Sequence, residues 1–214
     1  MPSTSDKTIG RLSLYRRLLS GLQASGVRYV YSHQLAAMAG GTAAQVRRDM
    51  MSIGYSGTPT RGYDVLELMA SISRFLDEPT GRGVALVGAG NLGRAIMAYF
   101  AGRRPNLTVV AAFDSDPHKV NRVIHGCHCY PMDELPDVIA REGILVGIIT
   151  VPAGEAQAVA DRLVRAGVRG LLNFAPVPLR APPGVYVEDR DMTTSLEKVA
   201  YFARQHAMEK EVRP

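Results

Sequence analysis

A glycine-rich turn between a short apolar strand and an amphipathic helix constrains this chain more than any other feature. The apolar run Val84–Val87 leads directly into Gly88-Ala89-Gly90-Asn91-Leu92-Gly93, and apolar residues then recur at helical spacing. In such a turn the first glycine permits the tight bend, the second lets a pyrophosphate approach the backbone, and the third lets the helix pack closely on the strand. Backbone N–H groups at the helix start, near Asn91 and Leu92, attract phosphate. The pattern predicts a Rossmann-like parallel sheet that binds a dinucleotide.

An acidic residue at the end of the next predicted strand indicates which dinucleotide is bound. The run Val109–Phe113 ends at Asp114, which lies 21 residues after Gly93. A carboxylate near this position hydrogen-bonds the ribose hydroxyls of NAD and repels the 2′-phosphate of NADP. We therefore predict NADH and NAD⁺ as ligands. The alternative for Asp114 is a residue that only ends the strand and begins the next helix.

Two later strand ends are predicted to line the same site. The run 144–150 ends at Thr150-Val151-Pro152, a helix covers 155–166, and the run 170–172 ends at Asn173-Phe174-Ala175. Ligands of parallel sheets bind beyond the carboxyl ends of the strands, so these residues are expected beside the dinucleotide. Ordinary loop structure is the alternative.

The residues expected of a dehydrogenase are missing. Such an enzyme needs a proton donor or acceptor beside the nicotinamide. His118 follows the predicted ribose carboxylate and therefore lies on the adenosine side, and the chain contains no Tyr-x-x-x-Lys pattern. We predict a domain that binds NAD(H) without turning it over, and therefore no catalytic residue. An NAD-dependent oxidoreductase with a basic appendage remains the alternative from another class, and a coenzyme A-binding domain is a third.

The segment His125-Gly-Cys127-His128-Cys129 contains metal-binding residue types at poor spacing for zinc. Alternation along a strand would place the two cysteines on one face and His128 on the other. We therefore predict a core strand and no metal site. A thiol redox role is the weaker alternative, because no basic group is fixed beside the sulfurs.

Positive charge is concentrated at the beginning of the chain. The formal net charge is +5, yet residues 1–61 contain eight Lys and Arg against two Asp, so the remainder is close to neutral. A basic block joined to a neutral body is typical of a polyanion-binding module. A solvated basic surface is the alternative from charge alone.

The residue pattern of this basic block favours a helix-turn-helix. Apolar residues from Leu12 to Leu22 predict a first helix, Ser32 is expected to cap a second, and Gly40-Gly41 forms the turn. Thr42 and Gln45 match a capping box at the start of a third helix. The residues of this recognition helix that are expected to reach bases or phosphates are Thr42, Ala44, Gln45, Arg47 and Arg48.

A wing and a closing helix are expected to complete this domain. The segment Tyr55–Tyr63 has the Gly, Pro and aromatic residues of a small β-hairpin, with Arg61 near its tip, and apolar residues from Val65 to Leu76 predict the last helix. A linker is predicted over 77–83. The resulting prediction is an α/β protein with a winged-helix DNA-binding domain over 1–78, a Rossmann-like NAD(H)-binding domain over 83–190, and a dimerisation helix and tail over 191–214.

Length and composition agree with this organisation. The 214 residues are 46% hydrophobic and 21% charged, with two cysteines, which is typical of folded globular domains. No apolar run approaches the roughly 20 residues needed to cross a bilayer, and the first residues lack the apolar stretch of a signal peptide. We therefore predict a cytoplasmic protein without a membrane association.

Five short stretches in this order make the chain similar to the Rex family of bacterial redox-sensing transcriptional repressors. They are Gln45-Val-Arg-Arg-Asp49, Gly88–Gly93, Thr150-Val-Pro152, Ala156-Gln157 and Asn173-Phe-Ala-Pro176. The resemblance, which extends from Arg11 to the terminal helix, implies a homodimer with exchanged C-terminal helices. It also implies binding to operator DNA that NAD⁺ permits and NADH releases. Helix-turn-helix dimers commonly bind two half-sites, so we expect a palindromic operator.

The resemblance also assigns residues. Tyr99 and Asp191 match positions thought to meet across subunits when NADH binds. Family wings carry basic residues where this chain has Thr58 and Pro59, and Arg61 is expected to substitute for them. The predicted cofactor-binding set is Gly88, Ala89, Gly90, Asn91, Leu92, Gly93, Tyr99, Asp114, Thr150, Val151, Pro152, Asn173, Phe174, Ala175 and Pro176. The predicted DNA-binding set is Arg11, Ser32, Thr42, Ala44, Gln45, Arg47, Arg48 and Arg61.

Overall fold

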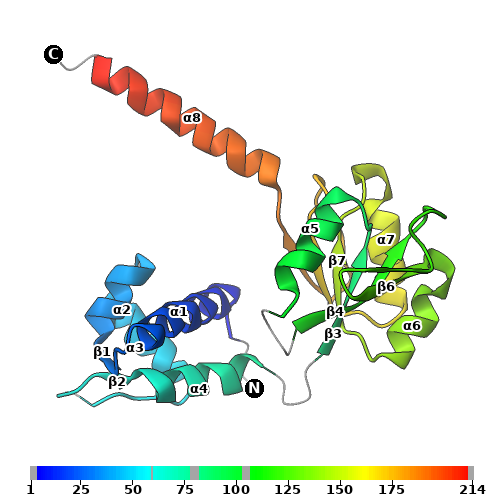
Figure 1. Cartoon of the computed structure of the whole chain (residues 1–214). Coiled ribbons are helices and arrows are strands. Elements are labelled where there is room, and N and C mark those ends of the chain that lie inside the picture. The colour runs from blue at the N-terminus through cyan, green and yellow to red at the C-terminus, as the bar shows by residue number, and fades with distance from the viewer. Residues whose placement is uncertain (1–3, 59, 78–81, 103–106, 212–214) are drawn as a thin grey trace. The chain divides into compact units, whose positions relative to one another are not determined.

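Helices make up most of the first part of the chain, and a mostly parallel sheet organises the second. The computed structural model describes residues 4–58, 60–77, 82–102 and 107–211 (Figure 1). The chain divides into two compact units, unit 1 over Met1–Pro79 and unit 2 over Thr80–Pro214. Each unit has its own buried core.

Unit 1 contains four helices and one small two-stranded sheet among its described residues. In chain order they are α1 Asp6–Ala24, β1 Tyr29–Val30, α2 Ser32–Ala39, α3 Ala43–Ser52, β2 Tyr63–Asp64 and α4 Val65–Leu76. The apolar faces predicted from helical spacing converge on one core, in which Leu12, Leu19 and Val46 are fully buried. Burial of such faces is the main source of stability for helices of this length.

The turn between α2 and α3 follows the predicted chemistry with two corrections. Gly40 ends α2 in the left-handed conformation (φ 67°), as expected for a glycine at this position. Ser32 is the first residue of α2 and not its cap, because Tyr31 occupies the N-cap position. Thr42 does accept a hydrogen bond from the Gln45 amide (3.2 Å), but the Gln45 side chain turns to Asp49, so the capping box is only half formed.

The predicted wing is a very short hairpin, in which Thr58 and Gly62 exchange backbone hydrogen bonds of 2.9 and 2.8 Å. An isolated bridge joins Thr58 to Gly62, and Pro59 lies outside the described residues. The following strand, β2, pairs antiparallel with β1 and thus ties the wing to the segment that precedes α2. Asp64 then caps α4 by accepting hydrogen bonds from the amides of Leu66 and Glu67.

Unit 2 is built on a seven-stranded sheet in the order β5-β6-β4-β3-β7-β8-β9. The strands are β3 Arg82–Val87, β4 Leu107–Asp114, β5 Arg122–Ile124, β6 Cys127–Pro131, β7 Val146–Ile149, β8 Gly170–Asn173 and β9 Tyr186–Asp189. All neighbouring pairs are parallel except β5 and β6. The chain leaves β3 toward β4 on one side and returns to β7 on the other. A ligand crevice is expected at this switch point, beyond the carboxyl ends of β3 and β7.

Two apolar clusters, each containing side chains of the strands, form the core of unit 2. One contains Phe113, Leu135 and Leu163, and the other contains Leu86, Ile96 and Cys129. The helices that connect these strands are α5 Asn91–Phe100, the short 3-10 turn η1 Met132–Glu134, α6 Leu135–Arg141 and α7 Ala153–Arg165. Strand β3 begins at Arg82, so residues 82 and 83 of the predicted linker belong to a strand, while residues 78–81 lie outside the described residues.

The cysteine-containing segment is the core strand that alternation predicts. Cys127 and Cys129 on β6 are both buried, whereas His128 between them is only half-buried. Burial raises the pKa of the Cys127 thiol to about 11, which keeps it protonated at neutral pH. Within the described ranges, no group of three or more His, Cys, Asp or Glu side chains is arranged to hold a metal ion.

The last element, α8 Met192–Glu211, shows an apolar surface to solvent. Asp191 caps it by accepting hydrogen bonds from the amides of Thr193 and Thr194. Its exposed apolar side chains are Met192, Leu196, Val199, Tyr201 and Phe202. Among the helices that the structure describes, none combines the length and apolar character needed to cross a membrane.

Candidate nucleotide pocket and DNA-binding face

A cavity of about 860 Å³ lies beyond the carboxyl ends of β3, β4 and β7. This is the switch point that the strand order defines. Ten of the fifteen predicted cofactor residues line it, namely Gly88, Gly90, Asn91, Leu92, Asp114, Thr150, Val151, Pro152, Phe174 and Pro176. The structure thus brings the glycine-rich turn, the predicted ribose carboxylate and both later strand ends to one site.

The three motif glycines occupy different surroundings that match their predicted roles. Gly88 has a φ of 99°, and a Cβ placed there would lie 2.7 Å from the Thr150 carbonyl oxygen. A Cβ on Gly93 would collide with the Gly88 carbonyl oxygen, so the absence of a side chain lets α5 pack against the turn. A Cβ on Gly90 would meet nothing within 4 Å, because this residue faces the open cavity. Gly90 is also the N-cap of α5 and has no side chain to satisfy the helix's first amides.

Asp114 is buried at one end of the cavity and is held by the backbone. Its carboxylate accepts hydrogen bonds from the amides of Ala89 (2.8 Å) and Asp116 (2.9 Å). Ala89 therefore serves the site by fixing this carboxylate and does not line the cavity. Lys119 lies 3.3 Å from the same carboxylate. Sequence reasoning missed Lys119, although its position five residues after Asp114 at a strand end was a usable signal.

Asn173 and Ala175 do not line the cavity as predicted but stabilise the turn that follows β8. Asn173 is fully buried, and its side-chain amide donates to the Val177 carbonyl (2.8 Å) and to Asp189 (2.7 Å). Its side-chain oxygen accepts from the Ala175 amide (3.0 Å). The clamp holds the turn after β8 and thereby sets the position of the neighbouring Phe174, which does line the cavity.

Phe174 also borders a second, smaller cavity at the start of α8. This cavity of about 370 Å³ is lined by Asp191 and Lys198 among others. Hydrogen bonds from the Thr194 hydroxyl and backbone lower the pKa of Asp191. Tyr99 lies on α5, is exposed, and packs edge-on against Phe100 rather than lining either cavity.

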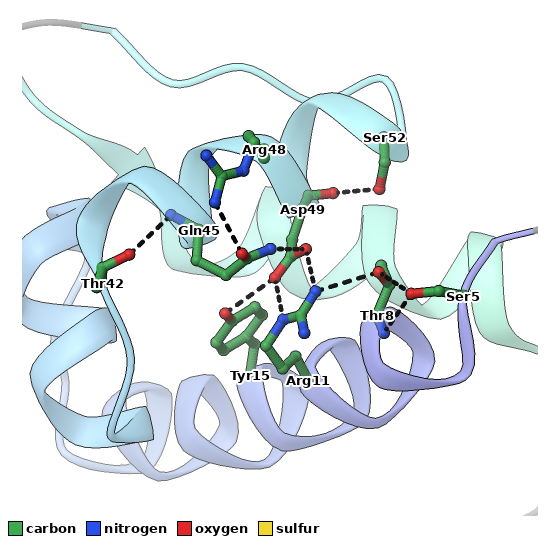
Figure 2. Close-up of polar contacts among 9 residues, drawn as sticks. All are labelled: Ser5, Thr8, Arg11, Tyr15, Thr42, Gln45, Arg48, Asp49 and Ser52. Carbon is green, nitrogen blue, oxygen red and sulfur yellow. Dashed lines mark hydrogen bonds and ion pairs between the residues drawn. The ribbon is translucent and has the colours of Figure 1, made fainter.

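In unit 1 the predicted DNA-binding residues Arg11 and Gln45 converge on a buried carboxylate (Figure 2). Asp49 on α3 is only 3% exposed and accepts two hydrogen bonds from Arg11 on α1, at 2.7 and 2.8 Å. Tyr15 of α1 donates to it at 3.1 Å, and Gln45 donates at 2.9 Å. We call Asp49, Arg11, Tyr15 and Gln45 the Asp49 cluster. It joins α1 to α3, a connection that local sequence patterns do not reveal.

The titration of these groups follows from their contacts. Burial alone would raise the pKa of Asp49, but hydrogen bonds from Arg11, Gln45 and Tyr15 lower it overall. Burial, together with the negative charge of Asp49, raises the pKa of Tyr15 to about 12. The Asp49 cluster is therefore charged on Asp49 and Arg11 and neutral on Tyr15 at physiological pH.

The remaining predicted DNA contacts lie on the solvent side of α3 and around the wing. Ala44, Arg47 and Arg48 are exposed on α3, and Arg61 is exposed in the wing turn. Arg48 donates to the Gln45 side chain (2.9 Å), and Arg47 donates to the Ser32 hydroxyl (3.1 Å). A hollow of about 410 Å³ between α3 and the wing is lined by Arg47 and Ser32, with three tyrosines, Tyr31, Tyr55 and Tyr63.

These features define a class of protein, a DNA-binding helical unit joined to a nucleotide-binding sheet. Two family models match the chain accordingly: "Putative DNA-binding protein N-terminus" over residues 3–50 and "CoA binding domain" over residues 80–177. A protein of known structure that is similar over the whole chain, RSP, is described as a Rex-family repressor. It has a TM-score of 0.87 at 32% identity, covering 99% of this chain and 100% of that one.

Curated relatives agree with the structural comparison. The redox-sensing transcriptional repressor Rex of Carboxydothermus hydrogenoformans is 40% identical over 94% of this chain and 96% of its own length. That of Pelotomaculum thermopropionicum is 39% identical over 92% of each. The chain belongs to the Rex family of redox-sensing transcriptional repressors. The predicted fold class, an N-terminal DNA-binding domain followed by a Rossmann-like parallel sheet, is thereby confirmed, as is the prediction of a regulator rather than an enzyme.

Proposed function

We propose that this chain binds operator DNA when NADH is scarce and is released from it by NADH, so that it reports the NADH/NAD⁺ ratio. The observation that carries the proposal is the cavity at the switch point, with the open face of Gly90 and the fixed carboxylate of Asp114. RSP, which is 32% identical with a TM-score of 0.88, was solved in complex with β-NAD⁺ and operator DNA. A further RSP structure contains β-NADH.

The residues of the cavity fit a dinucleotide. The amides that begin α5 would hold the pyrophosphate over Gly90, and Asp114 would take the adenosine ribose hydroxyls. Val151, Pro152 and Phe174 give the other part of the cavity an apolar lining. A neutral nicotinamide enters such surroundings at a lower desolvation cost than a cationic one, which gives a physical reason for a preference for NADH.

The coupling between the two ligands is a linkage. NADH weakens DNA binding by some factor, and DNA must weaken NADH binding by the same factor. To move the ratio of DNA-binding to non-binding conformation from 99:1 to 1:99, NADH must bind the non-binding conformation about 5.5 kcal/mol more tightly than the other. Coenzyme binding at unit 2 must therefore favour one arrangement of the dimer strongly over another.

The DNA contacts are proposed to come from the exposed residues of unit 1. Arg47, Arg48 and Ala44 on α3 would enter the major groove, while Arg61 would reach the backbone or minor groove beside the wing. Arg11 and Gln45 are already engaged by Asp49. Their contribution is therefore to hold α3 on α1 while presenting Arg48.

Dimerisation is proposed to occur through α8. Its exposed apolar side chains need a partner surface, and an exchanged helix of a second copy supplies one. In this dimer Asp191 of one copy would meet Tyr99 of the other, and two copies of unit 1 would bind a palindromic operator. The proposed domain bounds are 1–78 for DNA binding, 83–190 for NAD(H) binding and 191–214 for dimerisation. As a repressor of bacterial type, it would act in the cytoplasm.

The proposal is tested by titrating a palindromic duplex, selected by this chain from a random pool, with NADH and NAD⁺ at equal saturation. We expect NADH to release the DNA and NAD⁺ to leave it bound. Equal release by the two forms would refute redox sensing. Because one family model is named for coenzyme A, the same titration with coenzyme A serves as a comparison, and competition with NADH would show that both use this cavity.

A further inference from the structure

At the adenosine end of the coenzyme cavity, one lysine lies between two carboxylates. The Lys119 ammonium is 3.3 Å from Asp114 and 3.3 Å from Asp116, and all three side chains line the cavity. Asp114 is buried, while Lys119 and Asp116 are partly exposed at the mouth. This charged triplet was absent from the predicted cofactor set, which contained Asp114 alone.

The backbone of the turn holds the triplet in place. Asp114 is fixed by the amides of Ala89 and Asp116, and Asp116 accepts a hydrogen bond from the His118 amide (2.9 Å). The Lys119 amide in turn donates to the Asp116 carbonyl (3.0 Å). The turn therefore fixes the backbone of Lys119, and the two carboxylates hold its ammonium in place.

The contacts within the triplet favour the charged forms of Lys119 and Asp116. Partial burial alone would lower the pKa of Lys119, but hydrogen bonds and charge from Asp114 and Asp116 raise it overall. The His118 amide and Lys119 lower the pKa of Asp116. Two carboxylates lie beside one ammonium at this end of the cavity, so the formal charge of the triplet is negative.

We propose that Lys119 is a coenzyme-selecting residue whose charge is masked by Asp114 and Asp116. This inference rests on the proposed NAD(H) site and deepens it. While both carboxylates hold the ammonium, a ligand with a 2′-phosphate on its adenosine ribose meets a net negative end and is rejected. Without the carboxylates, the same ammonium becomes a cation suited to binding that phosphate. Selection against NADPH is therefore a property of the triplet and not of Asp114 alone.

The test compares NADPH with NADH in matched variants of the full chain, with dissociation constants from nicotinamide fluorescence titrations. In the Asp114→Asn/Asp116→Asn variant we expect NADPH affinity to rise relative to NADH affinity by about 10-fold or more, as one charge-assisted hydrogen bond supplies. Adding Lys119→Met should remove this gain, and adding Lys119→Arg should retain it. Lys7→Met, which removes an exposed lysine of unit 1, is the control and should not change the ratio.

The outcomes separate this inference from the proposed function. In the Asp114→Asn/Asp116→Asn variant, a ratio of NADPH to NADH affinity that Lys119→Met leaves unchanged would overturn the inference while leaving NADH sensing intact. A native chain that binds neither coenzyme would instead overturn the proposed function. If the doubly substituted chain binds neither coenzyme, Asp116→Asn with and without Lys119→Met decides, because Asp114 is then unchanged. There we expect a smaller shift toward NADPH that again depends on Lys119, and its absence refutes the inference.

Discussion

Replacing Asp49 by Asn should destabilise unit 1 more than any surface charge change. The native carboxylate is 3% exposed and accepts two charge-assisted hydrogen bonds from Arg11. Removing one partner of a buried ion pair costs about 3–5 kcal/mol, because the other charge is left unpaired. The Arg11 side chain is 30% exposed, so water recovers part of that loss. We therefore expect Asp49→Asn to lower the free energy of unfolding of unit 1 by roughly 2–3 kcal/mol.

Hydrogen exchange along a urea titration measures this quantity in the full chain. Peptides from α1 and α3 report the opening of unit 1, while peptides from β3 and β7 report unit 2 and should not change. Arg28→Gln is the matched control, since Arg28 is 77% exposed and 3.8 Å from Asp64. That substitution should cost about 0.5 kcal/mol or less.

A double-mutant cycle identifies the origin of the effect. If Arg11→Met is combined with Asp49→Asn, the two losses should be strongly non-additive, because both remove the same pair. A loss for Asp49→Asn below about 1 kcal/mol, or losses that simply add, would refute the claim that this carboxylate holds α1 and α3 together.

The same carboxylate sets an acid limit for unit 1. The hydrogen bonds to Asp49 lower its pKa in the folded chain relative to the ordinary value of about 3.9. Its stabilising contribution is therefore complete above about pH 4 and is lost as the pH falls through the lower folded value. Exchange of the α1 and α3 peptides at several acidic pH values checks this, and the Asp49→Asn variant should lack the transition.

Four further outcomes are expected. Gly93→Ala should destabilise unit 2 by about 1–3 kcal/mol in thermal unfolding, because its methyl collides with the Gly88 carbonyl. Gly90→Ala should leave thermal stability unchanged yet weaken NADH binding at least about 10-fold, because its methyl enters only the open cavity; equal behaviour of the two variants would contradict the assigned roles. The pKa of Tyr15 is raised to about 12, so its contribution should be present below about pH 10 and lost as the pH rises toward 12, as ultraviolet difference titration of unfolding would show. Leu196→Glu on α8 should convert a dimer to a monomer in analytical ultracentrifugation, and an unchanged mass would contradict the proposed interface.

Local patterns in the sequence determined the helices of unit 1, several strands of unit 2 and the position of the nucleotide site, but not β5, α6 or β9. The glycine-rich turn, the strand that ends at Asp114 and the two later strand ends obey rules that depend on neighbouring residues only. Backbone geometry near a glycine or a helix start is decided within a few positions. Parallel strands bring their carboxyl ends to one edge, so strand ends predicted separately meet at one cavity. Side chains alternate between the two faces of a strand, so the local pattern also sufficed to place Cys127 and Cys129 in the core.

Tertiary structure alone decided which polar side chains face ligands and which hold the fold. Arg11 and Asp49 are 38 residues apart, and Asn173 and Asp189 are 16 apart, so neither pair is visible in a local pattern. Asn173 is the last residue of β8 and Thr150 directly follows the neighbouring β7, yet the Asn173 side chain turns into the protein and clamps a loop. A buried polar group must find hydrogen-bond partners wherever the fold supplies them, and those partners depend on how elements distant in the chain pack together.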